Sequence, residues 1–183
     1  MKELSLYLLD IFYNSLSSGA DLIRIVIEKD DGKDRMRVKI TDNGRGMDHA
    51  FLARVKDPYT TTRTERNVGM GIPLLTQAAE QTGGGVRILS KLGCGTMLMA
   101  EFGLSDIDTP PMGNMQDSLV AMIASLEQCD LIFVLKNNDQ IAVELDTRQI
   151  REVLGNEILL STPDVMNWIR GYLKSEFENN TGE

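Results

Sequence analysis

Four short segments that combine glycine with acidic or amide side chains constrain this chain more than any other feature. Each lies within, or directly beside, a run of residues whose apolar spacing predicts a helix or a strand. In chain order they are Asp10-Ile-Phe-Tyr-Asn14, Asp42-Asn-Gly44-Arg-Gly46-Met47, Gly69-Met70-Gly71 and Gly93-Cys94-Gly95-Thr96. One such segment alone is weak evidence, so their order and the elements between them decide what they mean.

Apolar periodicity predicts helices and strands along the whole chain. Helical spacing occurs over residues 3–16, 49–55, 72–81, 115–126, 148–154 and 164–177. Alternation with a period of two, typical of strands, occurs over residues 22–28, 36–40, 86–90, 96–102, 131–135 and 141–145. Residues 106–111, with two prolines among short polar side chains, predict a linker or a turn onto a new surface.

Charge and cysteine content exclude several classes of function. The chain has 183 residues, a formal net charge of −8 and a pI of about 4.7. Nucleic-acid binding, which depends on lysine and arginine contacts to phosphates, is therefore not expected. Cys94 and Cys129 form no disulfide framework and lack metal-ligand spacing, which fits a reducing, cytoplasmic environment. No signal peptide or membrane-spanning apolar run is expected, so we predict no membrane partner.

Asp10 and Asn14 stand four residues apart in the first predicted helix, so their side chains share one face. The amide oxygen of Asn14 suits Mg²⁺, which prefers hard oxygen ligands and keeps several waters. The neighbouring carboxylate can hold or deprotonate a water placed in line with a phosphate. Taken alone, however, such a pair is more often a polar stripe on a surface helix.

The other segments supply groups that suit a nucleotide. A carboxylate at a strand end, Asp42, can accept the exocyclic amino group of adenine, and Gly44 and Gly46 leave room for close approach. In isolation this segment is also a common Asp-Asn-Gly turn. Gly69 and Gly71 precede a helix whose unpaired N–H groups form an anion site. Neither a Walker A loop nor a complete dinucleotide fingerprint is present.

Together the four segments resemble the ATP site of the GHKL superfamily, which includes gyrase, heat-shock chaperones, histidine kinases and mismatch-repair ATPases. The resemblance covers residues 1–103. It implies the Bergerat fold, an α/β (α+β) two-layer sandwich with a mixed, mostly antiparallel sheet covered by helices on one face. The helices that contain Asp10 and follow Gly71 should lie on that face. The resemblance also implies ATP and Mg²⁺ as ligands.

By the same resemblance, Asn14 is the Mg²⁺ ligand and Asp10 is the general base or water holder. Asp42 reads adenine, and Thr96 supports it. Residues 58–63 are similar to the histidine-kinase stretch that leads into the ATP lid, although Arg63 and Arg66 also fit a solvated loop. The residues expected to contact nucleotide are Asn14, Asp42, Gly44, Gly46, Met47, Thr61, Thr62, Arg63, Gly69, Met70, Gly71 and Thr96.

Two departures from the family bear on the reaction. Related hydrolases carry glutamate where this chain has Asp10, whose side chain is one methylene shorter. The only histidine, His49, follows the Asp42 segment, and the sequence places no two-helix dimerisation segment upstream of the site. We therefore do not expect a complete histidine kinase in this one chain. Cys94 is a redox-sensitive thiol beside the nucleotide or, as we prefer, an inert buried thiol.

Three functions stay open. The preferred one is a kinase-like regulatory subunit that transfers the γ-phosphate to a partner protein, as in anti-sigma-factor serine kinases. The second is an ATP-hydrolysing switch that closes its lid and forms a homodimer. The third is a regulatory module that senses the nucleotide without transferring anything. We expect two domains, a histidine-kinase-like ATP-binding domain at 1–103 and a C-terminal α+β extension of unknown role at 104–183.

Overall fold

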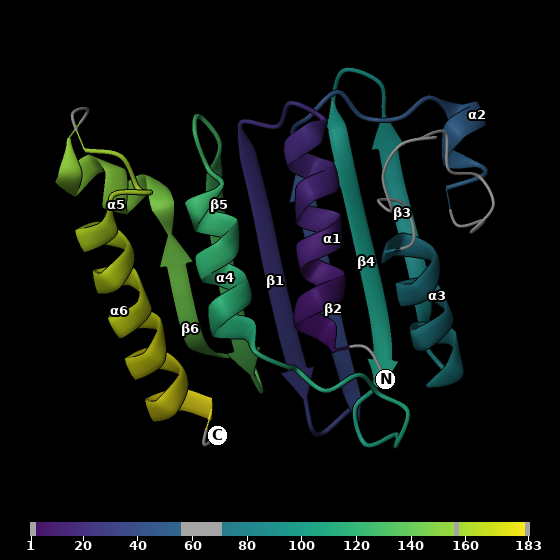
Figure 1. Cartoon of the computed structure of the whole chain (residues 1–183). Helices are drawn as coiled ribbons and strands as arrows, with labels where there is room; N and C mark the ends of the chain where they lie inside the picture. The colour runs from purple at the N-terminus through teal and green to yellow at the C-terminus, as the bar shows by residue number, and fades with distance from the viewer. Residues whose placement is uncertain (1–2, 56–70, 156–157, 182–183) are drawn as a thin grey trace.

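The computed structural model describes residues 3–55, 71–155 and 158–181 (Figure 1). Its helices are α1 (Leu4–Ser17), α2 (His49–Leu52), α3 (Gly71–Gln81), α4 (Met115–Ala124), α5 (Thr147–Leu154) and α6 (Pro163–Thr181). Its strands are β1 (Leu22–Asp30), β2 (Arg35–Asp42), β3 (Gly85–Lys91), β4 (Gly95–Gly103), β5 (Asp130–Asn137) and β6 (Gln140–Asp146). The predicted order of elements is thus confirmed, although α2 has only four residues and α4 ends at Ala124.

The six strands form one sheet in the order β3-β4-β2-β1-β5-β6. β1 and β5 run parallel, and every other neighbouring pair is antiparallel. The helices α1, α3, α4 and α6 cover one face of this sheet (Figure 1). The structure is therefore the predicted two-layer sandwich with a mixed, mostly antiparallel sheet, and the helices that contain Asp10 and follow Gly71 lie on the same face.

The core lies between the sheet and these helices because the strands alternate. In β1, Ile23, Ile25 and Ile27 are fully buried and belong to the core cluster. Arg24, between the first two of these isoleucines, is exposed on the opposite face. From α1, Phe12 is likewise fully buried in the cluster. The same period of two that predicted the strands therefore decides which face of the sheet the helices cover.

Both ends of α1 are fixed by tertiary contacts or turns. At its start, the N–H groups of Leu4 and Ser5 donate to the carbonyl oxygens of Pro111 and Met112, at 2.8 and 3.1 Å. These bonds satisfy two of the helix donors that have no partner within the helix. At its end, Gly19 takes a positive φ of 76° that stops the helix. The prolines predicted to form a linker or turn thus form a turn packed beneath α1.

Residues beyond this turn continue the sheet of the first hundred residues. β5 lies beside β1 in parallel register, from Leu22 opposite Asp130 to Lys29 opposite Asn137. The carboxylate of Asp130 accepts hydrogen bonds from Thr147, at 2.8 Å, and from Arg151, at 2.9 Å. These bonds tie the start of β5 to α5. The division into domains at 103/104 stays a prediction, but the sheet and the core cluster run across it.

α6 is the longest helix, with 19 residues. Its Ile169 and Leu173 are fully buried, and Phe177 stacks on Phe133 of β5 at a centroid distance of 6.3 Å. The hydroxyl of Tyr172 donates to the carbonyl oxygen of Glu144 in β6, at 2.9 Å. These contacts hold α6 on the sheet. Neither α6 nor any other helix in the described ranges is long and apolar enough to cross a membrane.

Candidate functional site

Helix α1 presents Asp10 and Asn14 on one face, as their spacing requires. Asp10 is exposed and Asn14 is half-buried. Among the described residues, neither side chain has a hydrogen-bond or ion-pair partner. The side-chain oxygens of Asp10 and Asn14 are therefore free to bind a ligand or a metal ion.

Asp10 lies directly against Gly71, the first residue of α3. A Cβ atom added to Gly71 would come within 2.8 Å of the Cβ of Asp10 and within 3.4 Å of its Oδ2. Gly71 is buried at this contact. Any side chain at position 71 would push the Asp10 carboxylate away, so glycine keeps that carboxylate next to the start of α3.

Asp42, at the end of β2, is held from two sides. Its Oδ2 accepts a hydrogen bond from the hydroxyl of Ser15 in α1, at 2.7 Å. Its Oδ1 accepts one from the backbone N–H of Gly44, at 3.0 Å. The residue is half-buried, and each carboxylate oxygen keeps a further lone pair for an outside donor. The carboxylate is therefore fixed in place and can still accept a bond from a ligand.

The glycines of the second and fourth segments let two backbone loops meet. A Cβ atom on Gly46 would lie 2.1 Å from the carbonyl oxygen of Lys91, and one on Gly95 would lie 2.0 Å from that of Asp42. At Gly44, the added atom would meet the hydroxyl oxygen of Ser18. The predicted close approach of a base at Gly44 and Gly46 stays a prediction, but protein atoms already require glycine at both positions.

Thr96 lies opposite Asp42 in the antiparallel register of β2 and β4. Its hydroxyl oxygen is 2.9 Å from that of Ser90, which donates to the carbonyl oxygen of Gly95 and accepts the N–H of Met47. Ser90 thus ties the second segment to the fourth. In this structure the hydroxyl bound to the Asp42 carboxylate is that of Ser15, not Thr96.

The structure brings together the predicted residues Asp10, Asn14, Asp42, Gly44, Gly46, Met47, Gly71 and Thr96 around the C-terminal half of α1. The remaining predicted residues, Thr61, Thr62, Arg63, Gly69 and Met70, lie outside the described residues. The contact residues Ser15 and Ser90 were missed as site residues. Ser15 has one usable signal in the sequence, since it follows Asn14 directly, whereas Ser90 has none.

The two cysteines differ in environment. Cys129 is buried, and burial raises the pKa of its thiol to about 11. It therefore stays protonated near neutral pH and is a poor nucleophile. Cys94 is exposed in the turn between β3 and β4. The prediction of a buried Cys94 is wrong because the tight turn around two glycines of positive φ, Gly93 and Gly95, directs the residue between them outward.

The donor set suits a hard cation held mainly by a ligand. Among the described residues, no group of three or more His, Cys, Asp or Glu side chains could hold a metal ion. Mg²⁺ commonly binds through one or two protein oxygens, with phosphate oxygens and waters completing its octahedron. The free amide of Asn14, one helical turn from the free carboxylate of Asp10, fits that pattern.

Comparison with known proteins agrees with this geometry. A family model described as "Histidine kinase-, DNA gyrase B-, and HSP90-like ATPase" matches residues 2–106. A "Putative sensor protein" of Shewanella frigidimarina is 35% identical over 85 residues, which cover 46% of this chain and 13% of that protein. "Sensor histidine kinase ZraS" of Salmonella typhi is 30% identical over 96 residues, which cover 52% of this chain and 20% of that protein.

Among solved structures, the "Crystal Structure of N terminal domain of a DNA repair protein" aligns with a TM-score of 0.57 and 12% identity. The alignment covers 85% of this chain and 58% of that chain, so the shared fold extends beyond the matched family region. The chain spans a fifth or less of the length of these two curated relatives. Because the family model matches more than half of its residues, the chain belongs to the histidine kinase-, DNA gyrase B- and HSP90-like ATPases and carries their ATP-binding domain.

Proposed function

We propose that the chain binds Mg-ATP and transfers the γ-phosphate to a partner protein as a kinase-like regulatory subunit. The observation that carries this proposal is the position of α1. The helix holds Asp10 against Gly71 at the start of α3 and joins Asp42 through Ser15. One rigid element thus spans the two ends of the proposed site. The names of the curated relatives, a sensor protein and sensor histidine kinases, support a kinase over other ATPases.

The adenine end of the proposed site is Asp42. Its carboxylate accepts the exocyclic amino group of adenine while Ser15 and Gly44 hold it in place. Met47 and Thr96 support this end through their shared partner Ser90. An aspartate in this setting discriminates adenine from guanine, which presents a carbonyl oxygen at the corresponding position of its ring.

The phosphate end is formed by the start of α3. Gly71 offers its backbone N–H at the N-terminus of α3, where the dipole favours an anion. In this proposal Gly69 and Met70 belong to the same phosphate loop. In this proposal Thr61, Thr62 and Arg63 belong to a lid over the phosphates. Phosphoryl transfer depends mainly on such positioning and on charge neutralisation.

Asn14 holds Mg²⁺ in the proposed site, and Asp10 orients the group that attacks the phosphate. When bound, Mg²⁺ neutralises charge on the phosphate oxygens. The free Asp10 carboxylate beside Gly71 is placed to accept a proton from a hydroxyl or a water, or to hold it in line. Being one methylene shorter than glutamate, Asp10 reaches less far toward a water, which favours transfer to a partner over rapid hydrolysis.

The phosphoacceptor is proposed to lie on another protein. The only histidine of these 183 residues is His49, which is exposed in the four-residue helix α2 and follows the N-cap Asp48. Among the described residues, α2 forms hydrogen bonds only with residues next to it in sequence and none with the site. An acceptor on another protein needs only access to the γ-phosphate, because phosphoryl transfer depends mainly on positioning and charge neutralisation.

Phosphorus NMR of Mg-ATP with the purified protein tests the proposal. We expect line broadening from binding, slow release of inorganic phosphate, and transfer of label from γ-labelled ATP to a partner protein in a cell extract. Asp42→Asn should remove both binding and labelling. Asp10→Asn should keep binding and remove labelling, and Gly71→Ala, which displaces Asp10, should also remove labelling.

The alternatives give different results in the same experiment. Fast phosphate release without a partner, lost in Asp10→Asn, would replace the kinase by an ATP-hydrolysing switch. Tight binding without release or labelling in any mixture would replace it by a nucleotide-sensing module. Normal ATP binding by Asp42→Asn would overturn the assignment of the site itself.

A further inference from the structure

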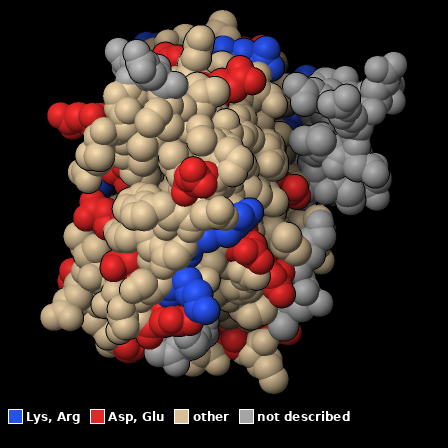
Figure 2. All heavy atoms as spheres, turned by 60° about the vertical axis from the view of Figure 1, so that its left-hand side comes forward, with Lys and Arg blue, Asp and Glu red and all other residues tan. Residues whose placement is uncertain are grey.

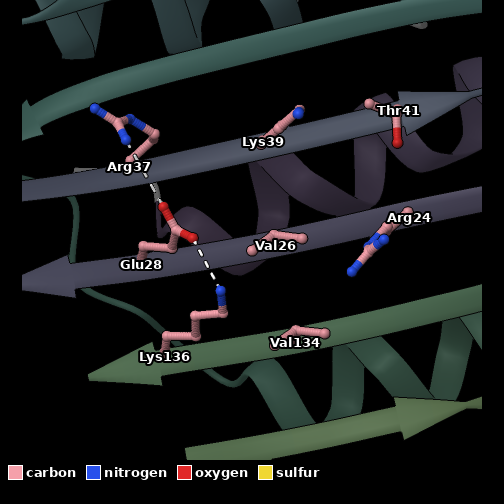
Figure 3. A pocket seen from close by; sticks show the side chains of 8 residues that line it. All are labelled: Arg24, Val26, Glu28, Arg37, Lys39, Thr41, Val134 and Lys136. Carbon is pink, nitrogen blue, oxygen red and sulfur yellow. Dashed lines mark hydrogen bonds and ion pairs between the residues drawn. The ribbon is translucent and has the colours of Figure 1, made fainter. Parts of the chain in front are cut away.

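The face of the sheet that the helices leave uncovered contains a hollow of about 320 Å³. Its floor is formed by Val26 of β1 and Val134 of β5, which lie side by side in the parallel register (Figure 3). Val26 is half-buried, whereas Val134 is only 3% exposed. Around them stand the side chains of Arg24, Glu28, Arg37, Lys39, Thr41 and Lys136. All eight lining residues belong to β1, β2 and β5, so the hollow lies on the opposite side of the sheet from α1.

The hollow is cationic although the chain is acidic. Four of its eight lining residues are lysine or arginine and one is glutamate, whereas the whole chain carries a net charge of −8. Figure 2, which brings the α6 side forward, shows acidic side chains spread over that surface, with basic side chains at its upper edge and across its lower centre. The lining of the hollow is therefore more cationic than the chain as a whole, although Glu101 and Glu144 lie on the same face of the sheet.

Two of these cations form no ion pair with a described residue, although the charge of Arg24 still acts on Asp146. Glu28 is shared by Lys136, at 3.3 Å, and Arg37, which also binds Glu101 at 2.7 Å (Figure 3). Arg24 and Lys39 form no ion pair or side-chain hydrogen bond with any described residue. Further out on this face, Asp146 is already bound by Arg148. Arg24 and Lys39 are thus available for outside carboxylates.

The spacing of these two cations favours a polypeptide over a single small anion. Arg24 lies opposite Thr41, and Lys39 lies opposite Val26, so the cations are diagonal neighbours on two adjacent strands. Such neighbours are about 7–8 Å apart. Carboxylates two residues apart in an extended segment are separated by about 6.6 Å. Two alternate acidic residues therefore match Arg24 and Lys39, and an apolar side chain between or beside them can lie on the half-buried Val26.

Nucleic acid fits the hollow less well. None of the eight lining residues is aromatic, whereas sheet faces that bind single strands stack bases on aromatic side chains. The floor is apolar and narrow, and only two of its cations are unpaired. The chemistry of the hollow matches a short acidic and apolar segment of protein.

We propose that the uncovered sheet face docks an extended acidic segment of a partner protein, with its carboxylates on Arg24 and Lys39 and an apolar side chain on the half-buried Val26. The neighbouring Met97 and Met99 of β4 lie on the same face, opposite Thr41 and Lys39 of β2. Methionine side chains adapt readily to a docked surface. The proposal requires neither ATP nor phosphate transfer, because this face is separated from α1 by the sheet.

Methyl NMR of protein labelled at methionine tests this directly. The probe is a synthetic peptide with glutamate at alternate positions and valine between them, added in the presence of saturating Mg-ATP. We expect saturable shifts of the Met97 and Met99 methyl signals and unchanged signals for the core residues Met36 and Met122, which are buried. The same peptide with glutamine in place of glutamate should cause no shift.

Charge reversal identifies the cations involved. The double variant Arg24→Glu with Lys39→Glu should bind the peptide at least tenfold more weakly. The matched control, Arg170→Glu with Lys174→Glu, makes the same charge change at exposed positions of α6 and should bind normally. If the reversal prevents folding, as shown by circular dichroism, Arg24→Gln with Lys39→Gln replaces it, with at least threefold weaker binding expected.

Several results would overturn the proposal. They are the absence of shifts at Met97 and Met99, equal shifts with the glutamine peptide, and equal affinity of both charge-reversal variants. Tighter binding of single-stranded DNA or of phosphatidylglycerol vesicles than of the peptide, dependent on Arg24 and Lys39, would assign the face to those ligands instead. None of these results changes the test of phosphate transfer, so the two proposals fail separately.

Discussion

The two faces of the sheet share the same strands but differ in what they contact. On β1, the isoleucines 23, 25 and 27 are fully buried under the helices, whereas Arg24 and Glu28 stand at the surface of the other face. The covered face is packed by this chain itself. The uncovered face carries a cationic hollow with two unpaired charges.

This difference shows how one short strand can serve stability and recognition together. Alternation places every second residue in the core, where large apolar side chains contribute most of the burial energy. The residues between them have little effect on the core, so they are free to carry charge. Substitutions at neighbouring positions of β1 should therefore have very different effects.

The largest effect is expected from Ile25→Ala, which removes a fully buried side chain from the core. It should lower the free energy of unfolding by about 2–5 kcal/mol, because it leaves a cavity. Val26→Ala, one residue along on the uncovered face, should lower it by at most about 1 kcal/mol. Urea denaturation of the two variants measures both. Equal losses would contradict the division of the strand into a core face and a free face.

The next effect concerns the loops that meet beside the proposed site. Gly46→Ala introduces both a positive φ of 67° for alanine and a clash with the Lys91 carbonyl oxygen. Gly19→Ala is the matched control, with a φ of 76° and no atom within 4 Å. Backbone strain alone destabilises by about 1–2 kcal/mol. We expect Gly46→Ala to exceed the control in denaturation and, unlike the control, to weaken ATP binding in calorimetry.

A smaller effect should depend on pH. The guanidinium of Arg148, hydrogen-bonded to Asp146, holds the pKa of that carboxyl below its usual range. Because the folded pKa is the lower one, the bond stabilises the protein above the unfolded pKa of about 3.9. The contribution disappears as pH falls through the folded value.

Asp146→Asn should therefore reduce the free energy of unfolding slightly at pH 7, because solvent screens this surface pair, and have little effect at pH 2–3. Asparagine still caps the start of α5, where Asp146 accepts the N–H of Arg148, so the difference reports the charge. Denaturation curves across this pH range measure it, and a difference that does not depend on pH would show that the charge is irrelevant.

The smallest effect is expected at Lys39, whose neighbours on the uncovered face include Arg37, two residues along β2, and the diagonal Arg24. Like charges so placed repel one another. Lys39→Thr should therefore raise the free energy of unfolding by a few tenths of a kcal/mol, measured at low salt. The gain should shrink at high salt, where charges are screened. A clear loss of stability would show that Lys39 serves the fold rather than a partner.

Much of this molecule could be predicted from local patterns. Periods of 3.6 and two residues identified its main helices and strands, because burial of one face imposes those periods. Asp10 and Asn14 were placed on one face by their spacing alone. The contact of Ser15 with Asp42 was not predictable, because 27 residues separate them and only the packing of α1 on the sheet joins them.

By itself, the sequence determined the order of elements, the residues that face the core, and the family of the ATP-binding domain. Only the tertiary structure decided that β5 lies parallel to β1, which makes the last part of the chain an extension of the same sheet. It also decided that Val26, Lys39 and Val134 line one hollow. Strand order depends on which apolar surfaces fit together across long loops, and that fit is a property of the packed chain rather than of any short segment.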